Sequence, residues 1–197
     1  MQLKGKTAII TGGGSGFGAS MADLFAKNGA KVIVADIDLD SARKVAEGTG
    51  GYALEVDVSN AKSVEQMKID IFKEHKKVDI VVNNAGTTHL PAPMETIEED
   101  EFDRVFNVNC KSVYLTAKHF VPHFKENKSG VILNIASTAG VSPRPNLNWY
   151  NSSKGWMILA SKTMAVELAP FGIRVNVINP VAGETPLLKS FLGEDTP

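Results

Sequence analysis

The chain has 197 residues, of which 43% are hydrophobic and 22% charged, and a formal net charge of -1 at pH 7, which fits a globular protein of one large or two small domains. Both charge signs are spread along the chain, so no basic stripe predicts a nucleic-acid partner, and no apolar run is long enough to predict a membrane span. The N-terminus does not resemble a signal peptide, and the single Cys110 can form no internal disulfide, which together predict a cytoplasmic protein.

Short apolar segments alternate with helical segments along the whole chain, with no internal repeat and no interdomain linker. Strands are expected at residues 7–10, 31–35, 52–58, 78–82, 130–135 and 174–178. Helices are expected after the glycine cluster at 12–18 and then at about 38–49, 59–75, 96–125 and 150–168. The strands are almost continuously apolar, as in parallel sheets that helices cover on both faces. The sequence therefore predicts a single doubly wound α/β domain over residues 1–197.

Two irregular segments, at 87–93 and 142–148, each follow the end of an expected strand. Ligands of open α/β sheets bind beyond the carboxyl ends of the strands, so both segments are predicted to form walls of a site. His89 lies in the first segment, and we expect it to be an exposed loop histidine rather than a substrate contact.

A glycine cluster marks the passage from the first strand to the first helix. The pyrophosphate of a dinucleotide must approach backbone N–H groups at a helix N-terminus, and side chains would block it. Gly12, Gly16 and Gly18 lie at that junction. A glycine-rich turn can also be only a tight turn, but its place after the first apolar strand favours a dinucleotide site.

Asp36 ends the second expected strand, eighteen residues after Gly18. An acid at this point can accept hydrogen bonds from the adenosine ribose hydroxyls and repels the additional phosphate of NADP. The alternative is that Asp36 caps the following helix, a role for which Asp38 and Asp40 compete. We expect NAD as the cofactor in preference to NADP.

Tyr150 and Lys154 are four residues apart at the start of an expected helix, so their side chains share one face. A tyrosine with its ordinary pKa of about 10 is a poor base at neutral pH, and a neighbouring ammonium favours the phenolate. Lowering that pKa by about three units corresponds to roughly 4 kcal/mol, which one cation in a partly buried site can supply. The alternative is an ordinary exposed helix pair.

Five motifs occur together in one order along the chain: Thr11-Gly12-x-x-x-Gly16-x-Gly18, Asn83-Asn84-Ala85-Gly86, Asn109, Ser137, and Tyr150-Asn151-Ser152-Ser153-Lys154. In this order and spacing they resemble the short-chain dehydrogenase/reductase family, from about Lys4 to Leu188. The resemblance implies a Rossmann fold with a dinucleotide at the carboxyl edge of the sheet.

The same resemblance implies roles for four catalytic residues. Tyr150 would exchange a proton with the substrate oxygen, which Ser137 would orient. Lys154 would lower the pKa of Tyr150 and bind the nicotinamide ribose, and Asn109 would hold a water that links Lys154 to solvent. For Asn109 a plain interpretation as a helix-breaking core residue is compatible with this role.

The predicted cofactor contacts combine the glycine loop, Asp36 and the positions that the resemblance adds. They are Gly12, Gly14, Ser15, Gly16, Phe17, Gly18, Asp36, Asp57, Val58, Asn83, Asn84, Ala85, Gly86, Tyr150, Lys154, Pro180 and Thr185. No metal is expected, because the helical pair His119 and His123 has no evident third ligand.

The chain departs from the family pattern at three places. Phe17 replaces a common isoleucine, and Val181 stands where a glycine is usual, which puts the local backbone path in question. Family chains continue with a further helix and a seventh strand, whereas this sequence stops at Pro197. We therefore expect it to be C-terminally incomplete, with the strand at 174–178 left as an apolar edge.

We expect an NAD-dependent alcohol or sugar dehydrogenase, or a carbonyl reductase, acting on a small molecule. A 3-oxoacyl-thioester (acyl-carrier-protein) reductase is the alternative enzyme, although that role usually takes NADPH, which Asp36 disfavours. A dinucleotide-sensing regulator is the alternative outside enzymes, and the intact Ser137, Tyr150 and Lys154 count against it.

We also expect a homodimer or homotetramer, since helices of the resembling family pair across a two-fold axis. A helical stripe of apolar residues, Ala160, Met164, Ala165 and Leu168, is predicted to form part of that interface.

Overall fold

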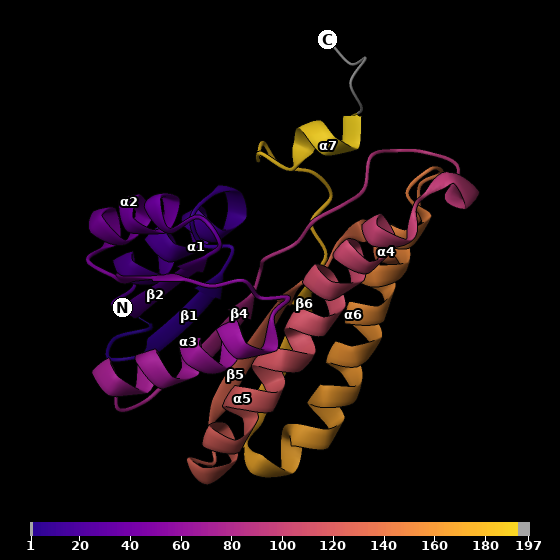
Figure 1. Ribbon diagram of the computed structural model, residues 1–197. Coiled ribbons are helices and arrows are strands. Elements are labelled where there is room, and N and C mark those ends of the chain that lie inside the picture. Colours follow the sequence, from indigo (N-terminus) through magenta and orange to yellow (C-terminus); the bar gives the residue numbers. More distant parts are fainter. Residues whose placement is uncertain (1, 193–197) are drawn as a thin grey trace.

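A computed structural model describes residues 2–192, which form one sheet with helices on both sides (Figure 1). Six parallel strands are ordered β3-β2-β1-β4-β5-β6. In chain order the strands are β1 (Thr7–Thr11), β2 (Lys31–Asp36), β3 (Tyr52–Glu55), β4 (Ile80–Asn83), β5 (Gly130–Ile135) and β6 (Ile173–Ile178). The strand order reverses between β1 and β4, and open α/β sheets bind ligands at the carboxyl edge of such a reversal. The predicted doubly wound α/β fold is confirmed.

Helices connect the successive parallel strands, so every connection is a crossover, and a further helix follows the last of these strands. They are α1 (Gly16–Lys27), α2 (Leu39–Thr49), α3 (Ala61–Glu74), α4 (Glu99–Phe106), α5 (Ser112–Glu126), α6 (Asn148–Leu168) and α7 (Leu188–Leu192). None of the helices within residues 2–192 is long and apolar enough to cross a membrane.

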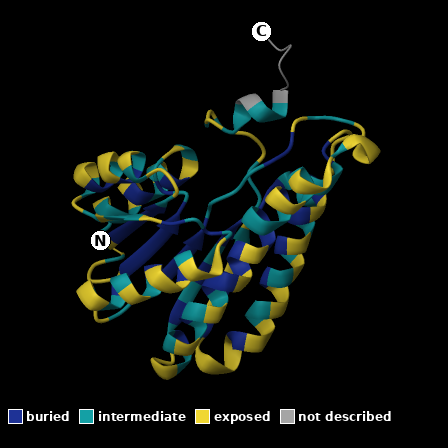
Figure 2. Cartoon of the chain, viewed as in Figure 1, coloured by how far each residue is buried: buried dark blue, intermediate teal, exposed yellow. Residues whose placement is uncertain are grey.

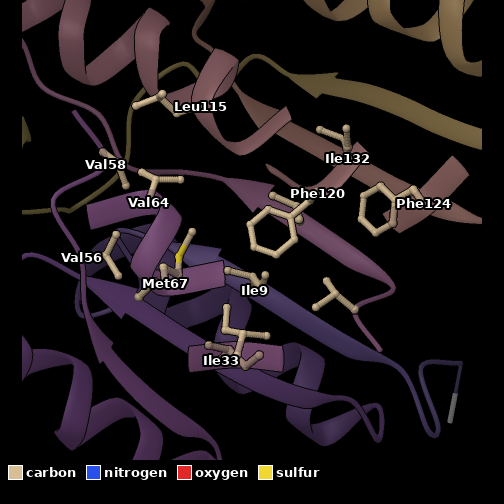
Figure 3. Close-up of a cluster of buried hydrophobic side chains, with 14 of the residues drawn as sticks. Ile9, Ile33, Val56, Val58, Val64, Met67, Leu115, Phe120, Phe124 and Ile132 are labelled. Atoms are coloured by element: carbon tan, nitrogen blue, oxygen red, sulfur yellow. The ribbon is translucent and has the colours of Figure 1, made fainter. Parts of the chain in front are cut away.

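Alternate residues of the inner strands pack into two separate hydrophobic cores, because successive side chains of a strand point to opposite faces of the sheet. Ile9 and Ile33 belong to a cluster with residues of α3, α5 and α6, among them Met67 and Phe120 (Figure 3). The neighbouring residues Ile10 and Val34 belong to a second cluster beneath α1 and α2. Burial of each large side chain contributes about 1.5–3 kcal/mol, so both faces hold the sheet in place.

The edge strand β6 follows a different pattern. Ile173 and Val175 are buried, whereas Arg174 and Asn176 are exposed. This alternation is typical of a strand that is covered on one face. Within residues 2–192, the prediction of a sheet covered on both faces therefore holds for the inner strands and not for β6.

The helix predicted over residues 96–125 is interrupted. A 3₁₀ turn (Met94–Thr96) precedes α4, and a π-helical turn, Asn107–Lys111, separates α4 from α5. π turns commonly mark functional positions in helices, and this one contains Asn109. The expected break at Asn109 is thus present in the structure.

Of the predicted interface stripe on α6, Leu168 is wrong because it is buried, whereas Ala160, Met164 and Ala165 are half-buried. Leu168 is a buried member of the first core, and Met164 and Ala165 pack against that core. The large apolar side chains that α6 exposes are Leu159, Val166 and the partly exposed Trp156, and α5 adds Tyr114. Packing against the sheet sets the rotation of α6 about its axis. Residues that the sequence periodicity assigned to the outer face therefore pack against the core. In Figure 2 the exposed and buried residues alternate along α5 and α6.

Candidate active site

A cavity of about 220 Å³ lies beyond the carboxyl ends of β1, β4 and β5. Tyr150 and Lys154 of α6 line it together with Ser137, which follows β5. The other predicted site residues in its wall are Gly12, Ser15, Gly16, Phe17, Asn84, Ala85, Gly86, Pro180 and Thr185. Five segments of the chain thus converge on one hollow, as expected for the carboxyl edge of an α/β sheet.

The glycine loop brings α1 close to β1. A Cβ atom at Gly18 would overlap the carbonyl oxygen of Gly12, so only glycine allows this approach. Gly12 itself has a φ of 60°, which disfavours other residues. Ser15 is the N-cap of α1 but makes no side-chain cap bond, and the first turn holds no acid. An uncapped, positive helix end beside the cavity fits a dinucleotide pyrophosphate.

Asp36 lies next to the glycine loop at the end of β2. Its Oδ2 accepts a hydrogen bond from the backbone N–H of Gly14 at 2.8 Å, and its Oδ1 accepts one from Asp38 at 3.1 Å. The N-cap of α2 is Asp38, whose carboxylate accepts from the N–H groups of Asp40 and Ser41. Asp36 is therefore not the helix cap, and a carboxylate retains further acceptor sites for ribose hydroxyls.

Asn84 joins the loops that follow β1 and β4. Its side-chain amide donates to the carbonyl oxygens of Thr11 at 3.0 Å and Gly12 at 2.9 Å. The Thr11 hydroxyl in turn accepts from the N–H groups of Asn84 and Ala85. These bonds fix the glycine loop against the Asn-Ala-Gly segment.

Several predicted cofactor residues lie outside the cavity wall, in addition to Asp36 discussed above. Asn83 is buried and bonded to Asn134 at 2.8 Å and to Thr116 at 2.8 Å, which makes it part of an internal polar network. Val58 is a member of the first core, and Asp57 accepts hydrogen bonds from the N–H and hydroxyl of Ser59. Gly14 and Gly18 are also absent from the cavity wall. These two glycines instead allow the close backbone packing of the glycine loop.

Ser137 and Tyr150 come together because α6 approaches the 3₁₀ turn Thr138–Gly140 closely. A Cβ atom at Gly140 would lie 2.7 Å from the backbone nitrogen of Gly155, so a larger residue would push α6 away. Tyr150 lies in the first turn of α6 and lines the same cavity as Ser137. Both residues are buried, so the cavity wall carries two hydroxyl groups that are largely removed from solvent.

The pKa of Tyr150 differs from the expectation. Burial raises it above the ordinary value, and the hydrogen bond from Ser137 and the positive charge of Arg144 offset that rise only in part. The Lys154 ammonium lies 5.9 Å from the Tyr150 ring centroid and is not among the groups that lower this pKa. The predicted lowering of the Tyr150 pKa by Lys154 is therefore absent from this arrangement, in which burial of the phenol has the largest influence on that pKa.

Lys154 is almost completely buried. Its ammonium donates to the carbonyl oxygen of Ile135 at 3.0 Å, and burial lowers its pKa to about 8. The thiol of Cys110 lies near enough to counter this shift slightly, while burial raises the pKa of that thiol to about 12. A lysine with a pKa near 8 can exchange a proton close to physiological pH.

Asn109 is fully buried and uses its amide for structure. It accepts from the Thr87 N–H and donates to the Thr87 carbonyl oxygen, both at 2.9 Å, and donates to Ser153 Oγ at 2.9 Å. The π turn thus connects the Asn-Ala-Gly loop to α6. One acceptor position on the amide oxygen remains for a further hydrogen bond.

Several residues of the cavity wall were not predicted from the sequence. They include Arg144, Leu147, Leu188 and Phe191, with the Phe191 ring 4.9 Å from that of Tyr150. Arg144 and Leu147 belong to the segment 142–148 that was predicted to be a wall, but nothing in the sequence indicated which side chains face inward. Contacts of α7 with Tyr150 depend on tertiary packing and have no local sequence signal.

Two loop residues, Val181 and His89, can be compared with the expectations for them. Val181 has no positive φ, so its backbone does not need the glycine that is usual there. The prediction of an exposed His89 is wrong, since this side chain is 1% exposed and its Nδ1 lies 2.8 Å from the Leu90 carbonyl oxygen. The 87–93 segment folds inward at this point instead of projecting into solvent.

His123, one of the two histidines considered as metal ligands, forms a hydrogen bond within the fold. Its Nε2 accepts a hydrogen bond from the backbone N–H of Val78 at 3.3 Å. Over the described range 2–192, no three His, Cys, Asp or Glu side chains gather as a metal site requires.

Known proteins share this sequence pattern and this geometry. A family model described as short chain dehydrogenase matches residues 6–195. The chain is 45% identical to 4-formylbenzenesulfonate dehydrogenase of Comamonas testosteroni, over all of this chain and 81% of that protein. It is 37% identical to a 3-oxoacyl-(acyl-carrier-protein) reductase of Thermotoga maritima, over 95% of this chain and 78% of that protein. A crystal structure of 3-ketoacyl-(acyl-carrier-protein) reductase from Brucella melitensis complexed with NADH gives a TM-score of 0.95 and 49% identity, covering 96% of this chain and 81% of that one.

Proposed function

The chain belongs to the short-chain dehydrogenase/reductase family, and from that premise we propose that it interconverts an alcohol and a carbonyl compound with NAD as the cofactor. The dinucleotide, when bound, supplies the hydride acceptor for alcohol oxidation or the hydride donor for carbonyl reduction. In balance, CH–OH and NAD⁺ give C=O, NADH and one proton. The protein must bind the substrate oxygen and move that proton.

Tyr150 is proposed to transfer the proton. Its hydroxyl donates to the carbonyl oxygen during reduction and accepts from the alcohol during oxidation. The raised pKa keeps the phenol protonated at neutral pH, which is the form that reduction requires. Ser137, which lines the cavity together with Tyr150, is proposed to hold the same substrate oxygen.

Lys154 and Asn109 are proposed to assist this proton transfer without contacting the substrate oxygen. Lys154 can return a proton toward Tyr150, because its pKa of about 8 allows exchange near neutral pH. Asn109 is proposed as a positioning residue, since its amide holds Thr87 and Ser153 in place. Its remaining acceptor position is where a water linking Lys154 to solvent would bind.

NAD is favoured over NADP by the position of Asp36. The carboxylate accepts a hydrogen bond from Gly14 in the glycine loop, and its negative charge would repel the additional phosphate of NADP. The relative solved with NADH is in line with this preference. The proposed dinucleotide contacts are the residues predicted from the sequence, namely Gly12, Gly14, Ser15, Gly16, Phe17, Gly18, Asp36, Asp57, Val58, Asn83, Asn84, Ala85, Gly86, Tyr150, Lys154, Pro180 and Thr185.

The observation that carries the proposal is that Ser137, Tyr150 and Lys154 line one cavity with the glycine loop. Tyr150→Phe tests it, because this variant removes one oxygen atom and keeps the ring. The variant should lose nearly all NADH-dependent reduction, measured at 340 nm, yet bind NADH like the wild type. Retention of turnover within tenfold of the wild-type rate would contradict the role given to Tyr150.

A second candidate is reduction of 3-oxoacyl thioesters, which two of the similar proteins are named for. Another relative is named for an aromatic aldehyde, so the names do not converge on one substrate. A panel of alcohols, sugars, aldehydes and 3-oxoacyl thioesters, assayed with NAD(H) and NADP(H), separates these candidates by kcat/KM. Turnover of any member also excludes a purely dinucleotide-sensing role.

We propose a homodimer or a homotetramer in the cytoplasm. Tyr114, Trp156, Leu159 and Val166 expose apolar area on α5 and α6, and symmetric contacts of such area form stable dimers. The buried free thiol of Cys110 fits a reducing compartment.

A further inference from the structure

The charged residues of the cavity wall are both cations. Within the part of the chain that the structure describes, Arg144 and Lys154 are the charged members of the lining, and no acid is among them. Lys154 is buried and donates to a backbone carbonyl. Arg144 lies at the exposed rim and forms no ion pair with any residue from 2 to 192. Its positive charge is therefore available to a molecule in the cavity.

Hydrogen bonds on both sides fix the segment that carries Arg144. The side-chain amide of Asn151, the residue after Tyr150, donates to the Arg144 carbonyl oxygen at 2.8 Å. The Asn146 carbonyl oxygen accepts from the N–H of Ala92 at 2.9 Å. The backbone of Arg144 is thus tied to the turn of α6 that holds Tyr150. The charge of Arg144 also reaches the Tyr150 phenol, whose pKa it lowers slightly.

The wall around Arg144 and Tyr150 is largely apolar. Leu147, Leu188 and Phe191 contribute to it, and the Phe191 ring contacts the ring of Tyr150 edge-on. On its other side Arg144 borders a shallow hollow that also contains Glu95, but no ion pair forms between them. A ligand that spans the cavity therefore meets hydroxyl groups at one end, an apolar wall, and a guanidinium at the rim.

We propose that this cavity selects carbonyl or alcohol substrates that carry a second, anionic group, which Arg144 binds. The substrate oxygen lies at Ser137 and Tyr150, an aromatic or aliphatic body lies against Leu147 and Phe191, and a carboxylate or sulfonate accepts the forked N–H donors of the guanidinium. The position of the reacting oxygen of the substrate rests on the proposed function. The position of its anionic group rests on the place of Arg144 in the cavity wall.

The test compares two aldehydes of equal size, 4-formylbenzoate and the neutral 4-formylbenzamide. Each is reduced by NADH and one proton to its benzylic alcohol, with NAD⁺ as the other product. Wild type should prefer the benzoate, and Arg144→Gln should reduce that kcat/KM ratio about tenfold or more, mainly through KM. Arg174→Gln is the matched control, since it removes an exposed arginine of β6 that is not part of the cavity wall and should leave the ratio unchanged.

A binding measurement separates this inference from the catalytic proposal. The two alcohols, 4-(hydroxymethyl)benzoate and 4-(hydroxymethyl)benzamide, do not react with NADH, so calorimetric titration of the NADH-loaded protein gives their affinities. A preference for the anion that Arg144→Gln abolishes supports the inference even if neither aldehyde is turned over, a result that would count only against the proposed reaction.

Two outcomes overturn the inference. One is equal affinity of the wild-type protein for the charged and neutral alcohols, or no binding of the charged one. The other is an equal loss on both probes in Arg144→Gln, which would mean that Arg144 acts only on Tyr150 or on local structure. The second outcome includes a shift in the pH–rate profile of Arg144→Gln without a change in the benzoate-to-benzamide ratio.

Discussion

The buried Lys154 predicts that this protein becomes more stable as the pH rises above neutrality. The pKa of this lysine falls from 10.5 to about 8 on folding, chiefly because burial disfavours the ammonium. Between these two values the unfolded chain keeps the proton and the native chain does not, so the free energy of unfolding increases with pH. The difference of about 2.5 pH units, at about 1.4 kcal/mol for each, corresponds to roughly 3–4 kcal/mol.

Lys154→Met removes this dependence, because methionine fills similar space without a charge. Denaturant unfolding at pH 7 and pH 10, at one protein concentration, gives the free-energy difference between the variant and the wild type. The variant should be the more stable at pH 7, and its advantage should shrink by about 2–3 kcal/mol at pH 10. Other titrating groups are common to both proteins and cancel in the comparison.

Lys162→Met is the matched control, as it removes an exposed lysine from the same helix. It should keep the wild-type pH dependence. If the difference between Lys154→Met and the wild type does not change from pH 7 to pH 10, the ammonium is solvated in the native protein. The burial of Lys154 and its proposed proton exchange near pH 8 would then both be wrong.

Three further predictions concern the glycine loop, the cofactor and the assembly. Gly18→Ala should weaken NADH binding about tenfold or more, measured by fluorescence titration, because its Cβ would overlap the loop backbone, whereas Gly48→Ala, where a Cβ meets nothing within 4 Å, should leave binding unchanged. Asp36→Ala should lower NAD affinity by about tenfold and raise the relative use of NADP, while Asp40→Ala should change neither; a wild type that prefers NADP would refute this assignment. Val166→Glu should convert the proposed oligomer to a smaller species in light scattering, and a monomeric wild type at micromolar concentration would refute the interface.

Much of the fold follows from local sequence patterns. Near-continuous apolar runs such as Ile80–Asn83 predict buried parallel strands because both of their faces lie under helices. Gly12 and Gly18 predict a close strand-to-helix passage because any Cβ there would meet the backbone. The spacing of Tyr150 and Lys154 places both on one face of a helix, which the structure brings into the cavity with Ser137.

Other features depend on which surface each helix turns toward the sheet. The periodicity of α6 is compatible with Met164 and Leu168 facing either outward or inward, and the core packing selects the inward orientation. The burial of His89 likewise depends on how the whole 87–93 segment packs, and the local sequence of that segment does not predict this packing.

The order of strands and helices, the glycine loop and the Ser-Tyr-Lys set can all be predicted from the chain alone, since each depends on sequence neighbours or on a recognisable spacing. The protonation states of the site residues and the choice of side chains that line the cavity are determined only by the tertiary structure. The pKa values of Tyr150 and Lys154 depend on how completely the fold removes water from them. The approach of Arg144 and Phe191 to Tyr150 depends on segments that are distant in sequence or irregular in structure, where no period constrains the direction of a side chain.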